Sequence, residues 1–145
     1  MVYLDTSFLA PLAIPEDTSE AVERYLCALD PGSLCTSLWT RVELASLLSR
    51  RQRMGEFDGE QAERIRAAFD RVLRKSLHLL VPTADDFVAA AELLRDAASG
   101  LRAGDALHLA VARNRGPMPV LTLDRGLVKA AKRLGIEAGT GIRLR

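Results

Sequence analysis

Short apolar segments alternate with amphipathic helical segments along this chain of 145 residues. The strand candidates cover residues 2–5, 34–36, 77–81 and 119–123, and Ile136 with residues 142–144 offers a last edge strand. The intervals between them are too long for hairpins, which favours parallel pairing through helical crossovers. Parallel sheets carry helices on both faces. The alternation therefore predicts a three-layer α/β/α sandwich around a mainly parallel sheet, with the strand order left open.

Helical periodicity fills the intervals between the strand candidates. The first helical segment, residues 6–13, is interrupted at Pro11, and a second one over residues 17–29 ends before Pro31-Gly32. Glycine follows several of the later segments, as expected at helix ends. The helices expected in the rest of the chain cover residues 37–54, 58–75, 83–98, 105–114 and 124–134.

The composition suits one packed domain over residues 1–145, with 48% hydrophobic and 27% charged residues. A membrane span needs about 20 mostly apolar residues, and the longest apolar stretches, such as residues 107–112, are far shorter. The amino terminus shows no secretory signal. The cysteines, Cys27 and Cys35, do not make a disulfide framework. We therefore expect a reduced, cytoplasmic protein that does not enter a membrane.

The net charge is only +1, but the charges are unevenly distributed. Residues 113–145 hold eight basic residues against two acidic ones, and Arg50, Arg51 and Arg53 form a second basic run. Arginine outnumbers lysine 17 to 3, and its planar guanidinium suits bidentate contacts with phosphate. Such a basic surface indicates either a nucleic-acid partner or a solvated face, and charge alone leaves both open.

Certain acidic residues fall where the carboxyl ends of the strands are expected. Asp5 ends the first strand, and Asp124 follows the strand of residues 120–123. Asp105 opens a helix, and Glu43 lies in the first turns of the helix after the second strand. Ligands of open parallel sheets bind outside the carboxyl ends of the strands. These carboxylates, from distant parts of the chain, are therefore expected to converge at one edge of the sheet.

Each acid also has a purely structural interpretation. Asp5, Asp105 and Asp124 could each cap the helix that follows, and Thr40-x-x-Glu43 fits a capping box. Capping does not require the acids to converge, and Ser, Thr or Asn would serve as well. Converging carboxylates repel one another unless a cation holds them, and Mg²⁺ prefers oxygen ligands. Taken together, the acids favour a divalent cation site.

A zinc site is not expected. His78 and His108 are single and belong to no Cys/His motif. His108, inside the apolar segment of residues 107–112, is interpreted as a packed helix residue rather than as a catalyst.

Four motifs that contain these acids resemble the acidic motifs of the PIN domain. They are Tyr-Leu-Asp-Thr-Ser at 3–7, Arg-Val-Glu-Leu at 41–44, Gly-Asp-Ala-Leu-His-Leu-Ala at 104–110 and Leu-Thr-Leu-Asp at 121–124. In particular they are similar to the VapC-type toxin ribonucleases of bacterial toxin–antitoxin pairs. The resemblance implies an endoribonuclease dependent on Mg²⁺ or Mn²⁺, in which a metal-activated water attacks the phosphodiester. Its catalytic and metal-holding residues would be Asp5, Glu43, Asp105 and Asp124.

The same resemblance suggests supporting residues around the acids. The hydroxyl of Ser7 or Thr6 would orient Asp5 or a metal-bound water, and Thr122 is a candidate of the same kind. Arg102, three residues before Asp105, would steady the acids or contact a phosphate. Its alternative role is an ordinary ion pair between positions i and i+3 of a helix.

The resemblance also implies partners. Such toxins usually form homodimers and are held inactive by a small VapB-type antitoxin, whose tail packs into an apolar groove. The helices of residues 37–54 and 58–75 could form that groove, and Leu47, Leu48 or Phe57 on an exposed face would be its sign. The alternative for these side chains is ordinary core packing. The RNA substrate itself is not named by the sequence.

Other classes fit less well. A phosphorelay receiver domain wants an acid pair at the end of the first strand, but Asp5 is flanked by Leu4 and Thr6. A phosphatase with a DxDxT motif wants an aspartate where Ser7 stands. A catalytically inert binding relative would have lost at least one of the acids. We therefore predict a metal-dependent endoribonuclease.

Overall fold

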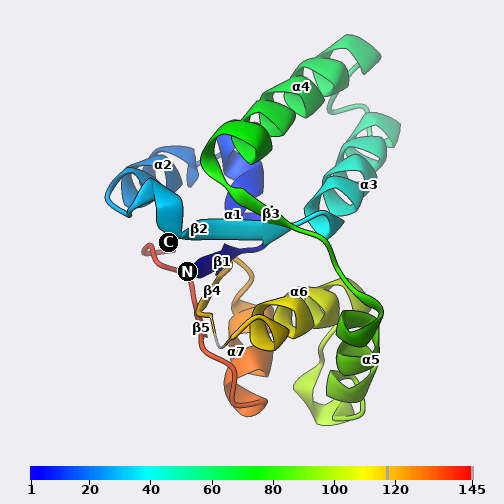
Figure 1. The fold of residues 1–145 in the computed structure, drawn as a ribbon. Coiled ribbons are helices and arrows are strands. Elements are labelled where there is room, and N and C mark those ends of the chain that lie inside the picture. The colour runs from blue at the N-terminus through cyan, green and yellow to red at the C-terminus, as the bar shows by residue number, and fades with distance from the viewer. Residues whose placement is uncertain (117, 145) are drawn as a thin grey trace.

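A computed structural model describes residues 1–116 and 118–144. The described residues form one five-stranded sheet in the order β3-β2-β1-β4-β5, and every pairing is parallel (Figure 1). The strands are β1 (Val2–Leu4), β2 (Leu34–Ser37), β3 (His78–Leu80), β4 (Val120–Leu121) and β5 (Ala138–Gly139). The parallel sheet predicted from the alternation of segments is confirmed. Arg145, the last residue of the basic segment, lies outside the described residues.

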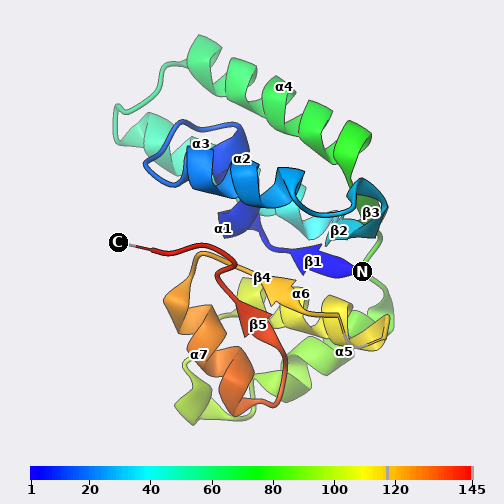
Figure 2. The same ribbon diagram turned by 90° about the vertical axis from the view of Figure 1, so that its left-hand side faces the viewer.

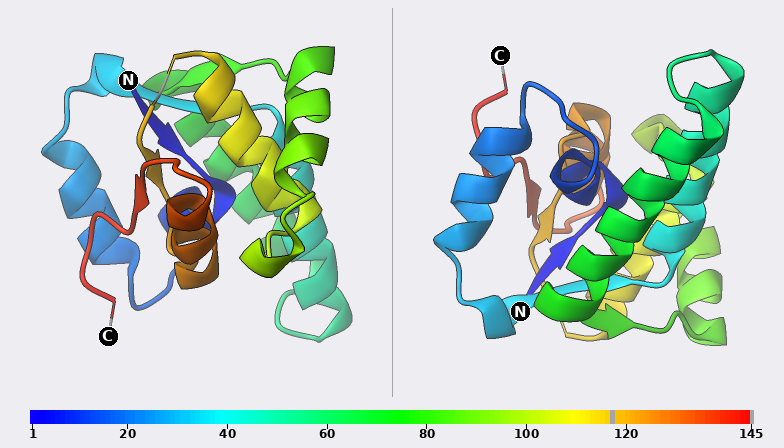
Figure 3. Two further views of the ribbon diagram at one scale, coloured as in Figure 1. Left: turned by 90° about the horizontal axis from the view of Figure 1, so that it is seen from below. Right: turned by 90° about the horizontal axis from the view of Figure 1, so that it is seen from above.

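Helices cover both faces of the sheet and give three layers (Figures 1 and 2). The first face carries α1 (Thr6–Leu9), α2 (Ser19–Cys27), α3 (Trp39–Arg53) and α4 (Gly59–Ser76). The second face carries α5 (Ala84–Leu93), α6 (Ala103–Asn114) and α7 (Arg125–Arg133). Helices α3 and α4 lie side by side, as do α5 and α6 (Figure 3). Short 3₁₀ turns occur at η1 (Ala10–Leu12), η2 (Pro31–Ser33) and η3 (Ala97–Ser99).

Alternating side chains along the strands divide the apolar core into two parts. Tyr3 and Val120 point to the face of α5–α7, whereas Leu4 and Leu121 point to the face of α1–α4. This alternation is the ordinary period of a β-strand, and burial on both faces explains why the strands read as short continuous apolar runs. The sandwich is thus built from two apolar clusters that share one thin sheet.

The strand order places a switch point at the middle of the sheet. From β1 the chain moves outward through β2 to β3, and it later returns beside β1 as β4 before moving outward to β5. Crevices at such switch points, outside the carboxyl ends of the strands, are where open α/β sheets bind ligands. The ends of β1 and β4 are therefore the place to look for a site.

Several expected boundaries are wrong. The helix expected over residues 83–98 ends at Leu93. The chain then forms the separate turn η3, which ends at Gly100 with a φ of 66°. The expected edge strand at Ile136 or residues 142–144 is instead Ala138–Gly139. Ile136 packs its side chain into the α5–α7 core, and its N–H bonds to the Ala131 carbonyl to close α7. Tertiary contacts, which no local pattern shows, decide both boundaries.

The first expected helix is broken as the sequence indicates. Helix α1 stops at Leu9, and η1 follows with Pro11 in its first turn. Proline has no N–H to donate to the carbonyl of residue 7, so an α-helix cannot continue regularly through it. The chain then turns away to α2.

The expected sign of an apolar groove between α3 and α4 is not found. Leu48 is fully buried, and Leu47 and Phe57 are partly buried and pack against the core. Core packing is therefore the correct interpretation of these side chains. An apolar hollow of about 550 Å³ lies elsewhere, between η1, α2 and the end of α4, with Leu26 and Val72 among its lining residues. No helix in the described part of the chain is long and apolar enough to span a membrane.

A buried carboxylate fastens the start of α5 to the end of α6. Asp86 is fully buried and accepts hydrogen bonds from the Thr83 N–H (2.8 Å), Asn114 Nδ2 (2.9 Å) and Arg115 Nη1 (2.9 and 3.0 Å). Arg115 also donates to the Val81 carbonyl. Burial alone raises the pKa of Asp86, but these hydrogen bonds outweigh it and hold the pKa below its ordinary value. Asp86 therefore stabilises the fold as a carboxylate.

Replacing Asp86 by asparagine should destabilise the protein at pH 7 by about 3 kcal/mol, because a broken buried ion pair costs ~3–5 kcal/mol and Arg115 keeps some exposure. A depressed pKa stabilises the fold above the unfolded pKa, near 4, and this stability is lost as the pH falls through the folded value. The difference between wild type and Asp86→Asn should therefore shrink below about pH 4. Denaturant melts at pH 7 and pH 3 test this, with the exposed neighbour Asp85→Asn as the control; a difference unchanged at pH 3 would contradict it.

Candidate functional site

A pocket of about 510 Å³ opens at the switch point of the sheet. It is lined by side chains from four separate segments of the chain, which include every acid singled out in the sequence. The predicted residues in its wall are Asp5, Thr6, Ser7, Glu43, Arg102, Asp105 and Asp124. The expectation that these acids meet at one edge of the sheet is thus met by the lining of the pocket.

Asp5 lies at the end of β1 and holds the start of α1. Its Oδ1 accepts hydrogen bonds from the Phe8 N–H (3.0 Å) and the Ser7 hydroxyl (2.8 Å), and its Oδ2 accepts one from the Thr122 hydroxyl (2.8 Å). The residue is only 4% exposed. Burial raises the pKa of Asp5 above its ordinary value, because His108 and the hydrogen bonds offset it only in part. Asp5 is therefore both a helix cap and a wall of the pocket.

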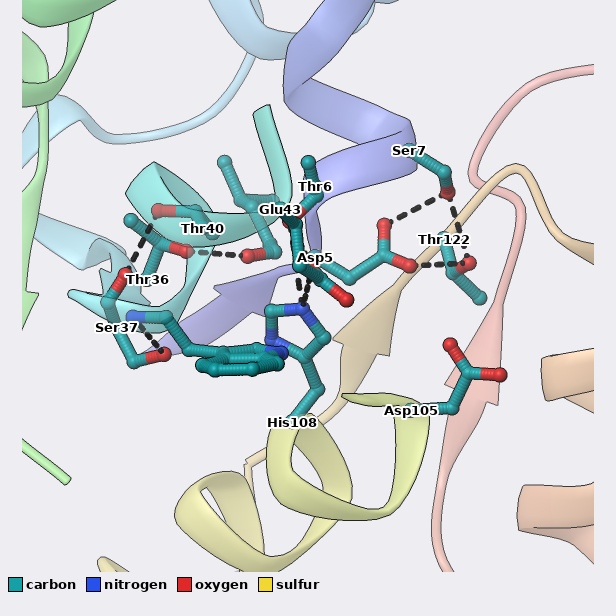
Figure 4. Close-up of polar contacts among 12 residues, drawn as sticks. Asp5, Thr6, Ser7, Thr36, Ser37, Thr40, Glu43, Asp105, His108 and Thr122 are labelled. Carbon is teal, nitrogen blue, oxygen red and sulfur yellow. Dashed lines mark hydrogen bonds and ion pairs between the residues drawn. The ribbon is translucent and has the colours of Figure 1, made fainter. Parts of the chain in front are cut away.

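Hydroxyl groups tie β1 to the segment after β4 around Asp5 (Figure 4). Ser7 Oγ lies 3.0 Å from Thr122 Oγ1 and accepts from the Leu123 N–H, while Thr122 Oγ1 accepts from the Asp124 N–H. Two of the predicted supporting residues, Ser7 and Thr122, thus contact Asp5 as expected. Thr6, the other hydroxyl considered for this role, contacts Glu43 instead.

Glu43 projects from the second turn of α3 and is held by two donors on one oxygen. Its Oε2 accepts from the Thr6 hydroxyl and lies 2.5 Å from His108 Nε2 (Figure 4). Burial raises the pKa of Glu43. The hydrogen bond and charge of His108 and the hydroxyl of Thr6 lower it by more than this, so the pKa lies below its ordinary value. The capping-box alternative is wrong, because α3 begins at Trp39 and the Thr40 hydroxyl donates to the Ser37 carbonyl.

The other oxygen of Glu43 faces the start of α6. A Cβ added at Gly104 would lie 2.6 Å from Glu43 Oε1 and 3.2 Å from Trp39 Nε1. A side chain at this position would displace the carboxylate of Glu43 from where it lies, so glycine permits the close approach of α6 to Glu43. Trp39 Nε1 is buried beside it and has no hydrogen-bond partner among the described residues. A donor and an acceptor thus stand together at this wall of the pocket.

Asp105 and Asp124 share the guanidinium of Arg102. Arg102 Nε lies 3.2 Å from Asp105 Oδ2, and its Nη2 lies 2.6 Å from Asp124 Oδ2. Burial raises the pKa of Asp105; Arg102 lowers it, Asp124 and Glu43 raise it, and the net shift is upward. Arg102 therefore steadies two acids from different helices, which is more than the simple i,i+3 pair.

The capping alternatives for these two acids have opposite outcomes. Asp124 caps α7, since its Oδ1 accepts from the N–H groups of Gly126 (2.7 Å) and Leu127 (3.2 Å). Asp105 caps nothing, because α6 begins at Ala103, two residues earlier than expected. Its carboxylate lies in the first turn of α6, where the helix dipole favours negative charge. Capping therefore does not explain the acid of Asp105.

The donor set of the pocket suits a hard divalent ion, although the acids are not drawn together around one. In residues 1–116 and 118–144, no group of three or more His, Cys, Asp or Glu side chains is arranged to hold a metal ion. The guanidinium of Arg102 lies between Asp105 and Asp124, and hydroxyl groups donate hydrogen bonds to carboxylate oxygens of Asp5 and Glu43. The available ligands are nevertheless carboxylate and hydroxyl oxygens, the donors that Mg²⁺ and Mn²⁺ select.

Sequence reasoning missed the polar role of His108. It is buried, as expected of a packed helix residue, but it contacts Glu43 and Tyr3 rather than only apolar side chains. Its position three residues after Asp105 was the available signal, because residues i and i+3 share a helix face. Trp39, four residues before Glu43, carried the same signal on α3.

Comparisons with known proteins agree with this architecture. The sequence profile of the PIN domain matches residues 2–133. FitAcB from Neisseria gonorrhoeae is 18% identical with a TM-score of 0.74, over 97% of this chain and 98% of that one. VapC20 from Mycobacterium tuberculosis, described as a toxin that cleaves the sarcin–ricin loop, is 24% identical with a TM-score of 0.72, over 90% and 95% of the chains.

A toxin–antitoxin complex from Klebsiella pneumoniae contains a further similar chain, 18% identical with a TM-score of 0.66, over 99% of this chain and 100% of that one. No curated protein sequence matches this chain. The solved structures support the fold, and the profile covers nearly the whole sequence including all of the acidic motifs. The resemblance seen in those motifs is therefore confirmed, and the chain belongs to the PIN domain family.

Proposed function

We propose that this protein is an endoribonuclease dependent on Mg²⁺ or Mn²⁺ and acts as the toxin of a toxin–antitoxin pair. In this proposal residues 1–145 are a single nuclease domain in the cytoplasm. The observation that carries it is the lining of one pocket by Asp5, Glu43, Asp105 and Asp124, from four segments of the chain. The likeness to VapC20, described as a toxin that cleaves the sarcin–ricin loop, supports a toxin that cleaves RNA.

The four carboxylates would hold the ion, and the remaining residues prepare them. When bound, Mg²⁺ or Mn²⁺ supplies a Lewis acid for the scissile phosphate and acidifies a water that serves as the nucleophile. Ser7 and Thr122 fix the orientation of Asp5, and Thr6 fixes Glu43. Arg102 neutralises part of the acidic charge, and its side chain is 75% exposed, so it is accessible to a substrate phosphate.

Arg50 is the basic residue of α3 best placed to meet RNA. It is exposed and lines the acidic pocket, and it makes no ion pair within the described part of the chain. Arg51 is instead paired with Glu16 and Glu56 and lies over the ring of Phe57. Within the basic run, Arg50 is therefore free to bind phosphate, whereas Arg51 is committed to the fold and Arg53 donates to the Ser49 hydroxyl.

The proposal includes protein partners. Similar chains occur in the toxin–antitoxin complex of Klebsiella pneumoniae and in FitAB bound to a DNA fragment. We propose that this protein likewise forms a homodimer and binds a small VapB-type antitoxin that blocks the acidic pocket. Co-expression with the neighbouring reading frame, followed by copurification and an RNA cleavage assay, tests the inhibition.

Asp5→Asn should lower metal-dependent RNA cleavage by about 100-fold or more, the size of loss found when one group that stabilises transition-state charge is removed. Asparagine keeps the cap and the size of the side chain but not its negative charge. Cleavage of a total RNA pool by the purified protein, with Mn²⁺ and with chelator, is the measurement. Asp17→Asn, an exposed acid far from the pocket, should cleave like wild type. Persistent cleavage by the double variant Asp5→Asn, Asp105→Asn would contradict the assignment.

Mn²⁺ should raise the melting temperature of the wild type. At a Mn²⁺ concentration 100 times the dissociation constant, binding adds about 2.7 kcal/mol to the free energy of unfolding. Asp105→Asn should respond far less, because it lacks one ligand charge. Without metal this variant should melt higher than wild type at neutral pH, since burial, Asp124 and Glu43 all disfavour the charge of Asp105. Thermal melts of both proteins with chelator and with Mn²⁺ are the test. A melting temperature that Mn²⁺ shifts in neither protein would refute the metal site.

Arg50→Ala should weaken RNA binding and make its salt dependence shallower by about 0.7–1 unit of log K against log salt, the value of one phosphate contact. Arg51→Ala should leave the salt slope unchanged, because its guanidinium already faces carboxylates. Binding of a labelled single-stranded RNA to the inactive Asp5→Asn protein, measured at several salt concentrations, distinguishes the two. Equal slopes for Arg50→Ala and wild type would make Arg50 part of a solvated face.

A further inference from the structure

A buried chain of polar side chains runs from the sheet to Glu43. Ser37 Oγ of β2 lies 2.9 Å from Tyr3 Oη of β1, and Tyr3 Oη lies 2.7 Å from His108 Nδ1 of α6. His108 Nε2 then lies 2.5 Å from Glu43 Oε2 of α3. Ser37 and Tyr3 are fully buried and His108 is 1% exposed. Of these four residues, only Glu43 has a role in the proposed mechanism.

The chemistry of the carboxylate fixes the direction of the last bond. A carboxylate oxygen only accepts hydrogen bonds, so Nε2 of His108 must carry the hydrogen. Nδ1 faces the Tyr3 hydroxyl, which can donate or accept. The arrangement therefore places an imidazole N–H on Glu43 whichever charge the ring carries.

Packing keeps the imidazole in this orientation. The Tyr3 ring meets the His108 ring edge-on, with centroids 5.6 Å apart and an angle of 63° between their planes. Rotation of His108 would break two buried hydrogen bonds, and unsatisfied buried polar groups are costly.

The consequence for Glu43 is a division of labour between its oxygens. Oε2 is occupied by His108 and Thr6, whereas Oε1 faces Gly104 and Trp39 at the wall of the pocket. Partners behind a metal ligand that fix its orientation typically change metal affinity by 10–100-fold when they are removed. We infer that His108, oriented by Tyr3, is a positioning residue that fixes Glu43 and presents its Oε1 to a divalent ion in the pocket.

This inference rests on the proposed function and is tested by comparing His108→Leu with His108→Gln. Leucine fills the buried space but donates nothing, whereas the glutamine amide can still donate to Glu43. The Mn²⁺ dissociation constant, measured by titration calorimetry without RNA, should rise about 10–100-fold in His108→Leu. It should return to within a few-fold of wild type in His108→Gln. At fixed Mn²⁺ and with the RNA concentration varied, kcat should fall in His108→Leu while KM for RNA stays unchanged.

Tyr3→Phe keeps the inference testable if His108→Leu does not fold, because it removes one hydroxyl and leaves the ring in the core. It should weaken Mn²⁺ binding several-fold, whereas Tyr25→Phe, whose ring packs against Phe8 away from the pocket, should bind like wild type. Folded Tyr3→Phe and His108→Leu proteins that bind Mn²⁺ as tightly as wild type would overturn the inference. Equal weakening by glutamine and leucine would also overturn it, because the effect would then not depend on the donated hydrogen.

The wild type separates this inference from the proposed function. Wild-type protein that binds no Mn²⁺ and cleaves no RNA would overturn the proposed function and the positioning role together. Wild-type protein that does both, with a His108→Leu variant of equal Mn²⁺ affinity, would leave the nuclease assignment intact and refute the role of His108 alone.

Discussion

The buried carboxylate of Asp5 is the interaction on which the arrangement of the site depends. Asp5 follows the central strand β1 and caps α1 by accepting a hydrogen bond from the Phe8 N–H. It also accepts a hydrogen bond from the hydroxyl of Thr122, just after β4. Asp5 and Thr122, which are 117 residues apart in the chain, thereby join β1 and β4 at their carboxyl ends. A carboxylate this deeply buried is stable only with hydrogen bonds of this kind. The same contacts that make the charge tolerable also place it in the pocket.

All four acids line the pocket, but only two of them also cap a helix. Asp5 and Asp124 cap α1 and α7, so the capping interpretation is correct for these two acids. Glu43 and Asp105 cap nothing, and their placement follows from packing between α3 and α6. Helix capping and a shared site were therefore not true alternatives. A cap needs only one oxygen, and the second oxygen makes a further contact in both residues, with Thr122 at Asp5 and with Arg102 at Asp124.

The sequence predicted the layers, the parallel pairing and the convergence of the acids, because periodicity and strand ends are local signals. It missed the end of α5 at Leu93 and the strand Ala138–Gly139, since these depend on contacts with distant segments. His108 shows the same limit within the site. Its apolar neighbours predicted burial correctly, but the partners Tyr3 and Glu43 come from other elements and appear only in the fold.

The acidic pocket also spans the two layers of helices. Glu43 comes from α3 on one face of the sheet, whereas Asp105 comes from α6 on the other face and Asp124 caps α7 there. At this edge the sheet no longer separates the layers, and the hydrogen bond between His108 and Glu43 is a direct polar link between them. An ion held by all of these carboxylates would cross-link the two layers of helices. Binding of the ion would then also make this edge of the fold harder to open.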